Sequence, residues 1–225
     1  MTFWTIFIIY MQVNDVKIES LVQYLANALN TELPGMESHR KMIPSFPDNV
    51  PEYFNYDQKL REAAVLIVLE VTNYSINTVL IERVPDAGPH SGQIAFPGGR
   101  KEDDDIDLFE TALREAKEEV GIELNRENCL GTLTSVQIPI SKYCVEPVIC
   151  YTDKISDLVK CEDEVNNIFV VDLLELLETE AIRAVQARGI VIKAPSFKFE
   201  NQIVWGATAM VLKELKDIFR TFLNS

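Results

Sequence analysis

The segment from His90 to Ile122 reads HSGQIAFPGGRKEDDDIDLFETALREAKEEVGI and is the most informative part of the chain. It predicts a Gly-Gly turn, an acidic loop and then a helix from about Asp107 to Val120. Gly121 suits the left-handed residue that commonly ends a helix. At about 100° per residue, one side of this helix has the i, i+3, i+4, i+7 spacing of an apolar stripe, so we expect it to pack against a core. The stripe consists of Phe109, Ala112, Leu113, Ala116 and Val120.

Three carboxylates lie on another side of the same helix. Glu115, Glu118 and Glu119 fall within an arc of roughly 100°. Like charges this close repel each other, and a hard divalent cation such as Mg²⁺ or Mn²⁺, which prefers oxygen ligands, removes that repulsion. Arg114 lies one turn before Glu118 and can orient it by a charge-assisted hydrogen bond. The pattern therefore favours a metal site.

A plain solvated helix face is the alternative interpretation of these charges. Two neighbouring features favour the metal site instead. The turn at 97–99 (PGG) leaves backbone amides and carbonyls open to a ligand, and the tract at 102–105 (EDDD) adds negative charge that alone would only weaken the fold.

These residues resemble the Nudix box, G-x5-E-x7-R-E-U-x-E-E-x-G-U, where U is an aliphatic residue. The second half of the box matches fully over 114–122 (REAKEEVGI). The first half departs from it, because the spacing from Gly99 to Arg114 is one residue longer. The position of the consensus acid consequently falls on Ile106, with Asp105 and Asp107 beside it.

The upstream sequence resembles the coenzyme A pyrophosphatase branch of that family, whose signature has the form L-L-T-x-R-[SA]-x3-R-x3-G-x3-F-P-G-G. Val84 stands where the branch has a small residue, and Gly88 replaces its second arginine. The longer acidic loop, the pair Glu164-Val165 and the run at 203–209 (IVWGATA) are also similar to the branch. The matching signature positions are Arg83, Gly92, Phe96, Pro97, Gly98 and Gly99.

The resemblance implies an α+β Nudix fold, in which a mixed, curved sheet lies between helices. It implies that Glu115, Glu118 and Glu119 bind Mg²⁺ or Mn²⁺ with a backbone carbonyl of Gly98 or Gly99, while Arg114 holds the carboxylates. Arg83 is either a phosphate contact or a salt bridge on a strand. Glu164 is the candidate for an additional acid, in competition with Asp163, Glu162 and the interpretation of a plain solvated loop.

The implied reaction is hydrolysis of coenzyme A or an acyl derivative to 4′-phosphopantetheine and adenosine 3′,5′-bisphosphate. A first alternative is a Nudix diphosphatase for ADP-ribose, NADH or a dinucleoside polyphosphate, which Gly88 keeps open. A second alternative is a silent Nudix domain that binds a nucleotide as a regulator, although an intact set of three glutamates argues against it.

Composition limits the partners. The formal charge of −14 argues against general nucleic-acid binding, which needs a basic face, and against anionic membrane surfaces. The four cysteines show no C-x-x-C pairing, which favours free thiols in a reducing compartment. We therefore expect a cytoplasmic enzyme with a small-molecule nucleotide substrate, and the family resemblance is compatible with a homodimer.

Residues 1–60 are expected to form an N-terminal extension and residues 61–225 the Nudix domain. The extension combines an apolar leader (1–13), an amphipathic helix (16–30) and a proline-rich connector with Pro44, Pro47 and Pro51. His39 lies just ahead of these prolines and is expected to be solvated. The leader is too short to span a bilayer comfortably and lacks signal-peptide features. It is a packed strand or helix, a weak membrane-associating segment, or an over-long reading frame with Met11 as the start. We narrowly favour the last, because helical patterning begins only after Met11.

Within the expected domain, apolar runs and turn residues predict the remaining elements. A short helix is expected at 172–180, capped by Asp172, and a closing amphipathic helix is expected after Trp205-Gly206. Strands are expected at 63–71, 78–84, 131–138, 145–151, 165–171 and 189–193, with a hairpin at 197–204.

Overall fold

The computed structural model describes residues 18–45, 60–72, 75–85, 90–155, 157–187 and 189–223. Its helices are α2 (Ile18–Ala28), α3 (Gly35–Arg40), α4 (Leu108–Val120), the short 3₁₀ helix η1 (Arg126–Asn128), α5 (Leu173–Glu178) and α6 (Ala207–Leu223). Its strands are β1 (Arg61–Val71), β2 (Ile76–Arg83), β3 (Ile94–Ala95), β4 (Gly98–Arg100), β5 (Cys129–Thr132), β6 (Val136–Ile138), β7 (Tyr143–Thr152), β8 (Val165–Asp172), β9 (Ala181–Ala187), β10 (Ile190–Phe199) and β11 (Gln202–Trp205).

The larger sheet is mixed, as predicted. Its strand order is β3-β2-β1-β7-β5, while β4 pairs with β1, β6 with β7 and β8 with β2. Strands β1 and β7 are parallel, from Arg61↔Tyr143 to Glu70↔Thr152, and the other pairs are antiparallel. This central parallel pair explains why 63–71 reads as a continuous apolar run, since both faces of such strands are covered.

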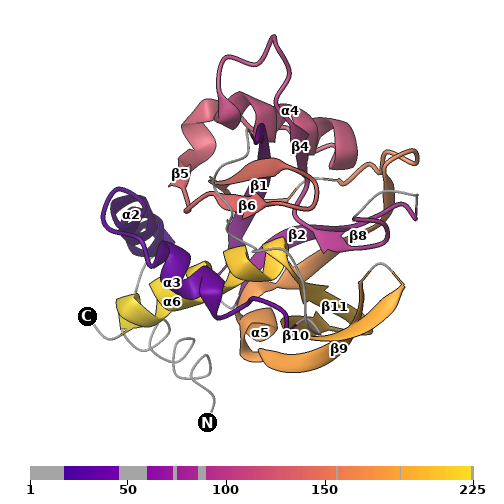
Figure 1. The fold of residues 1–225 in the computed structure, drawn as a ribbon. Helices are drawn as coiled ribbons and strands as arrows, with labels where there is room; N and C mark the ends of the chain where they lie inside the picture. The colour runs from indigo at the N-terminus through magenta and orange to yellow at the C-terminus, as the bar shows by residue number, and fades with distance from the viewer. Residues whose placement is uncertain are drawn as a thin grey trace.

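Successive residues of β1 point to opposite faces of the sheet. Leu66 and Val68 belong to the hydrophobic cluster shared with α4, whereas Ile67 and Leu69 belong to the cluster shared with α6. Figure 1 shows α4 above the sheet and α6 below it. The predicted α+β architecture, a mixed sheet between helices, is therefore confirmed.

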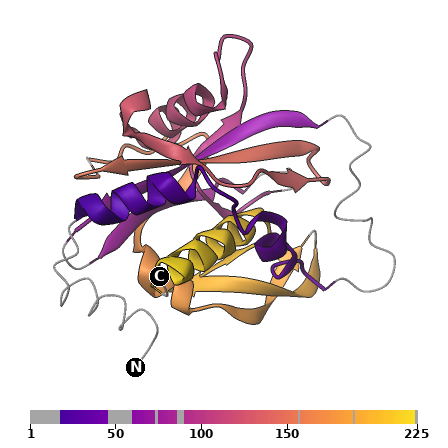
Figure 2. The same cartoon turned by 90° about the vertical axis from the view of Figure 1, so that its left-hand side faces the viewer.

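A second sheet, β11-β10-β9, lies on the far side of α6 from the larger sheet (Figure 2). The predicted hairpin is confirmed by the Phe199↔Gln202 pairing of β10 with β11. Strand β9 was not predicted. The apolar residues of this strand do not alternate in step with its buried positions. Ile182 is exposed, whereas Val185 is buried.

The N-terminal helices pack into the main core. Leu21 and Leu25 of α2 and Met42 after α3 are fully buried there, and the Tyr24 hydroxyl donates to the backbone oxygen of Ile218 on α6 (3.4 Å). The predicted helix at 16–30 is confirmed over its described residues. A second helix, α3, lies ahead of the proline-rich connector and was not predicted.

The expectation that His39 is solvated was wrong. Its side chain is 1% exposed, and its Nε2 lies 3.0 Å from Oε2 of Glu214 on α6. The other oxygen of Glu214 accepts hydrogen bonds from Gly35 N (3.1 Å) and Thr134 Oγ1 (2.7 Å). The local sequence around His39 is polar, and its burial depends on a carboxylate that is 175 residues away in the chain.

The strand expected at 131–138 is two strands, β5 and β6, which pair with different parts of β7. A register shift between Cys129 and Gly131 interrupts the first. The apolar leader, both candidate start residues and most of the proline-rich connector lie outside the described residues. In the described part of the chain, every helix is too short or too polar to cross a membrane.

Candidate active site

Helix α4 begins and ends where the sequence predicts. The side chain of Asp107 caps it by accepting from Phe109 N and Glu110 N, each at 3.0 Å. Gly121 ends it in the left-handed conformation (φ 74°). Ala112 and Ala116 are fully buried against the sheet, so the helix is fixed at both ends and along one side.

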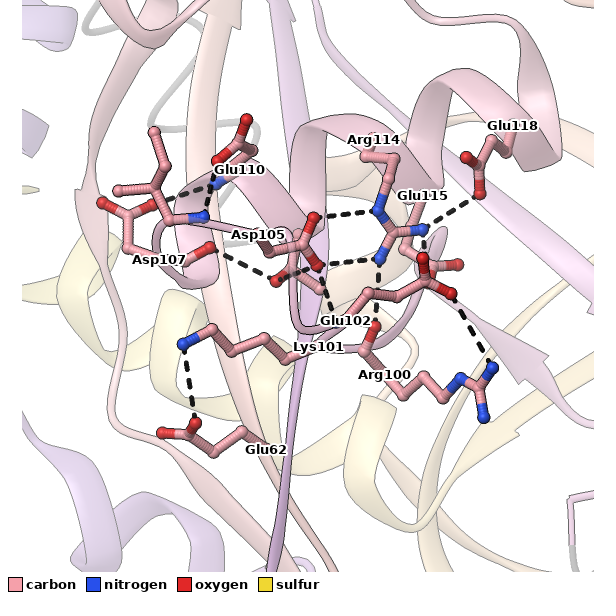
Figure 3. Close-up of polar contacts among 12 residues, drawn as sticks. Glu62, Arg100, Lys101, Glu102, Asp105, Asp107, Glu110, Arg114, Glu115 and Glu118 are labelled. Carbon is pink, nitrogen blue, oxygen red and sulfur yellow. Dashed lines mark hydrogen bonds and ion pairs between the residues drawn. The ribbon is translucent and has the colours of Figure 1, made fainter.

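Arg114 is the centre of a network of carboxylates (Figure 3). Its Nη1 donates to Glu115 Oε1 and to Glu118 Oε2, both at 3.0 Å, which confirms the predicted contact with Glu118. Its Nε and Nη2 donate to the two oxygens of Asp105 at 3.0 and 2.9 Å. The hydrogen bond to Asp105 raises the pKa of the guanidinium, which therefore stays charged.

Asp105 is a residue of the site whose role the sequence did not assign. It is 7% exposed and accepts from Thr111 Oγ1 and Glu102 N as well as from Arg114. Its hydrogen bond to Arg114 holds the pKa of Asp105 well below its ordinary value. Ile106, which occupies the consensus position of the acid, is 86% exposed. The extra loop residue thus moves the anchoring acid back by one position.

The three glutamates of the box have different surroundings. Glu119 is 1% exposed and Glu115 is 8% exposed, whereas the side chain of Glu118 is 60% exposed. Glu119 accepts from Gly98 N (2.8 Å), and its other oxygen lies 3.4 Å from Nη1 of Arg83. Burial raises the pKa of Glu119 to about 7 and also raises the pKa of Glu115.

Strand β4 brings bare backbone against these carboxylates. A Cβ atom on Gly99 would lie 2.4 Å from Oε2 of Glu115. A Cβ atom on Gly98 would lie 2.3 Å from the backbone oxygen of Ala64, and its φ of 151° is unfavourable for other residues. Glycine at 99 therefore lets Glu115 approach the main chain, whereas glycine at 98 lets β4 pass close to the backbone of β1.

The loop 157–165 places Glu164 beside α4, which is called the box helix because it carries Arg114 and the three glutamates. The backbone amides of Val159 and Cys161 donate to the carbonyls of Val120 and Glu119, both at 3.0 Å. Glu164 is exposed, and its charge raises the pKa of both Glu115 and Glu119. The competing residue Glu162 pairs with Lys160 (2.9 Å) instead.

Comparisons with known proteins show the family of this chain. Residues 60–191 match the family model described as NUDIX domain. The chain belongs to the Nudix family. The uncharacterized Nudix hydrolases NudL of Yersinia pestis and Yersinia pseudotuberculosis are each 30% identical to this Nudix hydrolase over 171 residues, which cover 75% of this chain and 85% of the relative.

Solved structures share the Nudix fold at low sequence identity. A MutT/nudix family protein from Enterococcus faecalis has a TM-score of 0.52 and 14% identity, covering 91% of this chain and 75% of its own. The NUDIX domain of Shewanella oneidensis NrtR, complexed with ADP ribose, has a TM-score of 0.51 and 12% identity, covering 76% of this chain and 94% of its own. These likenesses establish the fold alone.

Nudix hydrolases act on nucleoside diphosphate-linked compounds and generally use divalent metal ions. Within the described ranges, no three His, Cys, Asp or Glu side chains converge tightly enough to enclose an ion. The guanidinium of Arg114 instead bridges Glu115 and Glu118. The donor set nevertheless fits a hard cation. Glu115 and Glu119 are carboxylates whose pKa values are raised by burial, and carboxylate oxygens are the ligands that such a cation prefers.

Proposed function

We propose that this Nudix hydrolase is a metal-dependent diphosphatase that cleaves coenzyme A or acyl-coenzyme A. The observation that carries the proposal is the arrangement of the box glutamates, which are bound by Arg114 and lie against the bare backbone of Gly98 and Gly99 in β4. The upstream residues Arg83, Gly92 and Phe96, which match the coenzyme A branch signature, support this choice of substrate.

A divalent cation would supply the charge that neutralises the diphosphate oxygens and lowers the pKa of the attacking water. Glu115, Glu118, Glu119 and the carbonyl of Gly99 would hold it. Arg114 keeps Glu115 and Glu118 in position through its two 3.0 Å hydrogen bonds.

Two further residues would act on the substrate and the water. Arg83, which lies 3.4 Å from Glu119, would contact a phosphate. The water proton would pass to a carboxylate of the site. Glu164 is the candidate outside the box because it is exposed and its charge raises the pKa of both Glu115 and Glu119.

The substrate is tested by an assay of the purified protein against a panel of diphosphates with Mg²⁺ or Mn²⁺. We expect release of adenosine 3′,5′-bisphosphate from coenzyme A. Cleavage of ADP-ribose, NADH or dinucleoside polyphosphates alone would select another Nudix diphosphatase, an alternative supported by Gly88 in place of an arginine. Tight nucleotide binding without cleavage would select a regulator.

The proposal includes a cytoplasmic location and small nucleotide substrates rather than nucleic acid or a membrane surface. The net charge of −14 supports it, because polyanionic partners require a basic face that this composition disfavours. We propose a homodimer as the assembly to test by light scattering.

A further inference from the structure

Cys129 and Cys150 lie side by side on neighbouring strands. They are Cα partners in the antiparallel pairing of β5 with β7, and their Sγ atoms are 2.8 Å apart. Residues directly opposite each other in such a pair have Cα atoms about 4.5 to 5.5 Å apart. This separation lies within the range of about 4.4 to 6.8 Å that disulfides require. Both residues are free thiols in the structure, and the contact between their sulfur atoms brings them into position for a bridge.

The two thiols differ in accessibility. Cys150 is fully buried in the cluster beneath α4, whereas Cys129 is half-buried at the start of β5. A hydrogen bond from Cys150 lowers the pKa of Cys129, and the nearby guanidinium of Arg126 lowers it further. Because the thiolate is the reactive form of cysteine, Cys129 is the thiol that meets an oxidant and Cys150 the thiol that resolves the product.

We propose that Cys129 and Cys150 form a reversible disulfide when the protein encounters a hydroperoxide. The Cys129 thiolate attacks one peroxide oxygen, the O–O bond breaks, and hydroxide (or alkoxide) leaves to give a sulfenic acid. The Cys150 sulfur then attacks the Cys129 sulfur. The S–S bond forms, the S–O bond breaks, and the departing hydroxide takes the Cys150 proton as water. Two thiols are thereby oxidised, and one peroxide is reduced.

The position of the pair connects it to the box helix. Cys129 directly follows η1, where Arg126 pairs with Asp107, the N-cap of α4, and lies 4.1 Å from the ring centroid of Phe109. A bridge would tie this segment to β7, the strand that pairs in parallel with β1. Oxidation would therefore link η1 and the start of β5, which contact the N-terminal end of α4, covalently to β7. No carboxylate of the proposed metal site would be involved.

The test is peptide mapping of the full-length protein after exposure to hydrogen peroxide and alkylation with iodoacetamide. We expect a linked pair of peptides that contain Cys129 and Cys150, lighter by two hydrogen atoms, and near-complete loss of Cys129 labelling that dithiothreitol restores. Cys144→Ser and Cys161→Ser serve as matched controls, because both residues are also partly exposed thiols, and each variant should retain the link.

Two variants separate the roles of the partners. Cys129→Ser should leave Cys150 reduced after peroxide, and Cys150→Ala should leave Cys129 as a sulfenic acid that dimedone traps. If peroxide consumes Cys144 or Cys161 while Cys129 and Cys150 still alkylate fully on unfolding, the proposal is wrong. It is equally wrong if peroxide leaves all four thiols unchanged.

Discussion

Asp105 is the residue that fixes the orientation of Arg114, and through it the orientation of the glutamates on the box helix. It accepts two hydrogen bonds from Arg114 on one side of the guanidinium, so that the remaining nitrogen faces Glu115 and Glu118. Paired, bidentate contacts between arginine and carboxylate are strong and fix the orientation of both groups. The precision of the proposed ligands therefore depends on an acid that lies outside the helix.

We predict that Asp105→Ala lowers turnover at least roughly tenfold, because the carboxylates lose their orientation, and lowers the unfolding free energy by about 2 kcal/mol or more, because Arg114 loses a buried partner. Steady-state kinetics and urea melts measure both. Asp104→Ala, an exposed neighbour, should change neither. Adding Ile106→Asp should not restore activity, since this side chain is 86% exposed; restoration would contradict the assigned register.

We predict that Glu118→Gln nearly abolishes turnover and leaves the melting temperature unchanged. The side chain is 60% exposed and contributes a surface ion pair to Arg114, which is worth little to stability, but the variant removes the negative charge of a proposed metal ligand. Glu123→Gln is the matched control, since Glu123 is an exposed glutamate paired with Lys117. Undiminished turnover in Glu118→Gln would overturn the metal assignment.

The pKa of Glu119 predicts how the metal-free protein responds to pH. Burial raises that pKa from 4.5 to about 7. The unfolded chain therefore loses this proton at lower pH than the folded protein does. The stability that protonated Glu119 contributes, on the order of 3 kcal/mol, is complete below about pH 4.5 and is lost as the pH rises to about 7.

In EDTA we accordingly expect the melting temperature to fall between pH 4.5 and 7. The fall should be smaller in Glu119→Gln, whose amide oxygen can still accept from Gly98 N. Saturating Mg²⁺ should remove most of the fall, because the ion replaces the proton. An identical slope in the variant and the wild type would show that other groups cause the pH dependence.

At the scale of elements, the site is formed where β4 crosses the side of α4 that carries the glutamates. The register Ala64↔Gly99 and Val65↔Gly98 places both glycines between β1 and the carboxylates. The two glycines have different neighbours, however, because a side chain at 99 would meet a glutamate and a side chain at 98 would meet backbone.

We predict that Gly99→Ala mainly impairs chemistry, while Gly98→Ala mainly impairs folding. The new Cβ at 99 would displace the flexible end of Glu115, so metal affinity and turnover should fall roughly tenfold or more while stability changes by less than about 1 kcal/mol. At 98 the clash with Ala64 and the φ of 151° should lower stability by about 2 kcal/mol or more. Isothermal titration with Mn²⁺ and thermal melts distinguish the two. Equal loss of stability in both variants would contradict this account.

The elements that sequence predicted correctly are those whose signals are local. The apolar stripe, the Asp107 cap and Gly121 fix α4, and Asp172 caps α5 by accepting from Leu174 N and Glu175 N. The burial of His39 could not be predicted, because its partner Glu214 comes from the far end of the chain. The anchoring role of Asp105 depends on how one extra loop residue is accommodated, which the spacing alone leaves open.

At the scale of the whole molecule, the N-terminal helices complete the main core. Leu21, Leu25 and Met42 are fully buried there, and α3 covers the buried Glu214 of α6. Burying each apolar side chain contributes about 2 kcal/mol, and a domain has a net stability of only about 5 to 15 kcal/mol. Residues 18–45, the described part of the expected extension, therefore contribute a large share of the stability.

We predict that a truncated chain beginning at Arg61 loses cooperative thermal unfolding and aggregates, because it exposes that core and leaves Glu214 without His39. A chain beginning at Met11 keeps every described contact and should melt and turn over as the full-length protein does. Circular dichroism melts and gel filtration measure this. Cooperative melting of the Arg61 chain with normal activity would show that residues 61–225 form an independent domain.

The parallel pairing of β1 with β7 has a consequence for biosynthesis. Its Cα partners are separated by roughly eighty positions along the chain, and closing so long a loop precedes any gain from the pairing. The pairing of β2 with β8 likewise cannot be complete before Asp172, the last residue of β8, has been synthesised. Topologies dominated by such distant pairings fold slowly. An isolated helix as short as α4 is only marginally stable in water. We therefore expect that, as the nascent chain leaves the ribosome, α4 becomes stable only after the sheet that supports it is complete, when most of the protein has been translated.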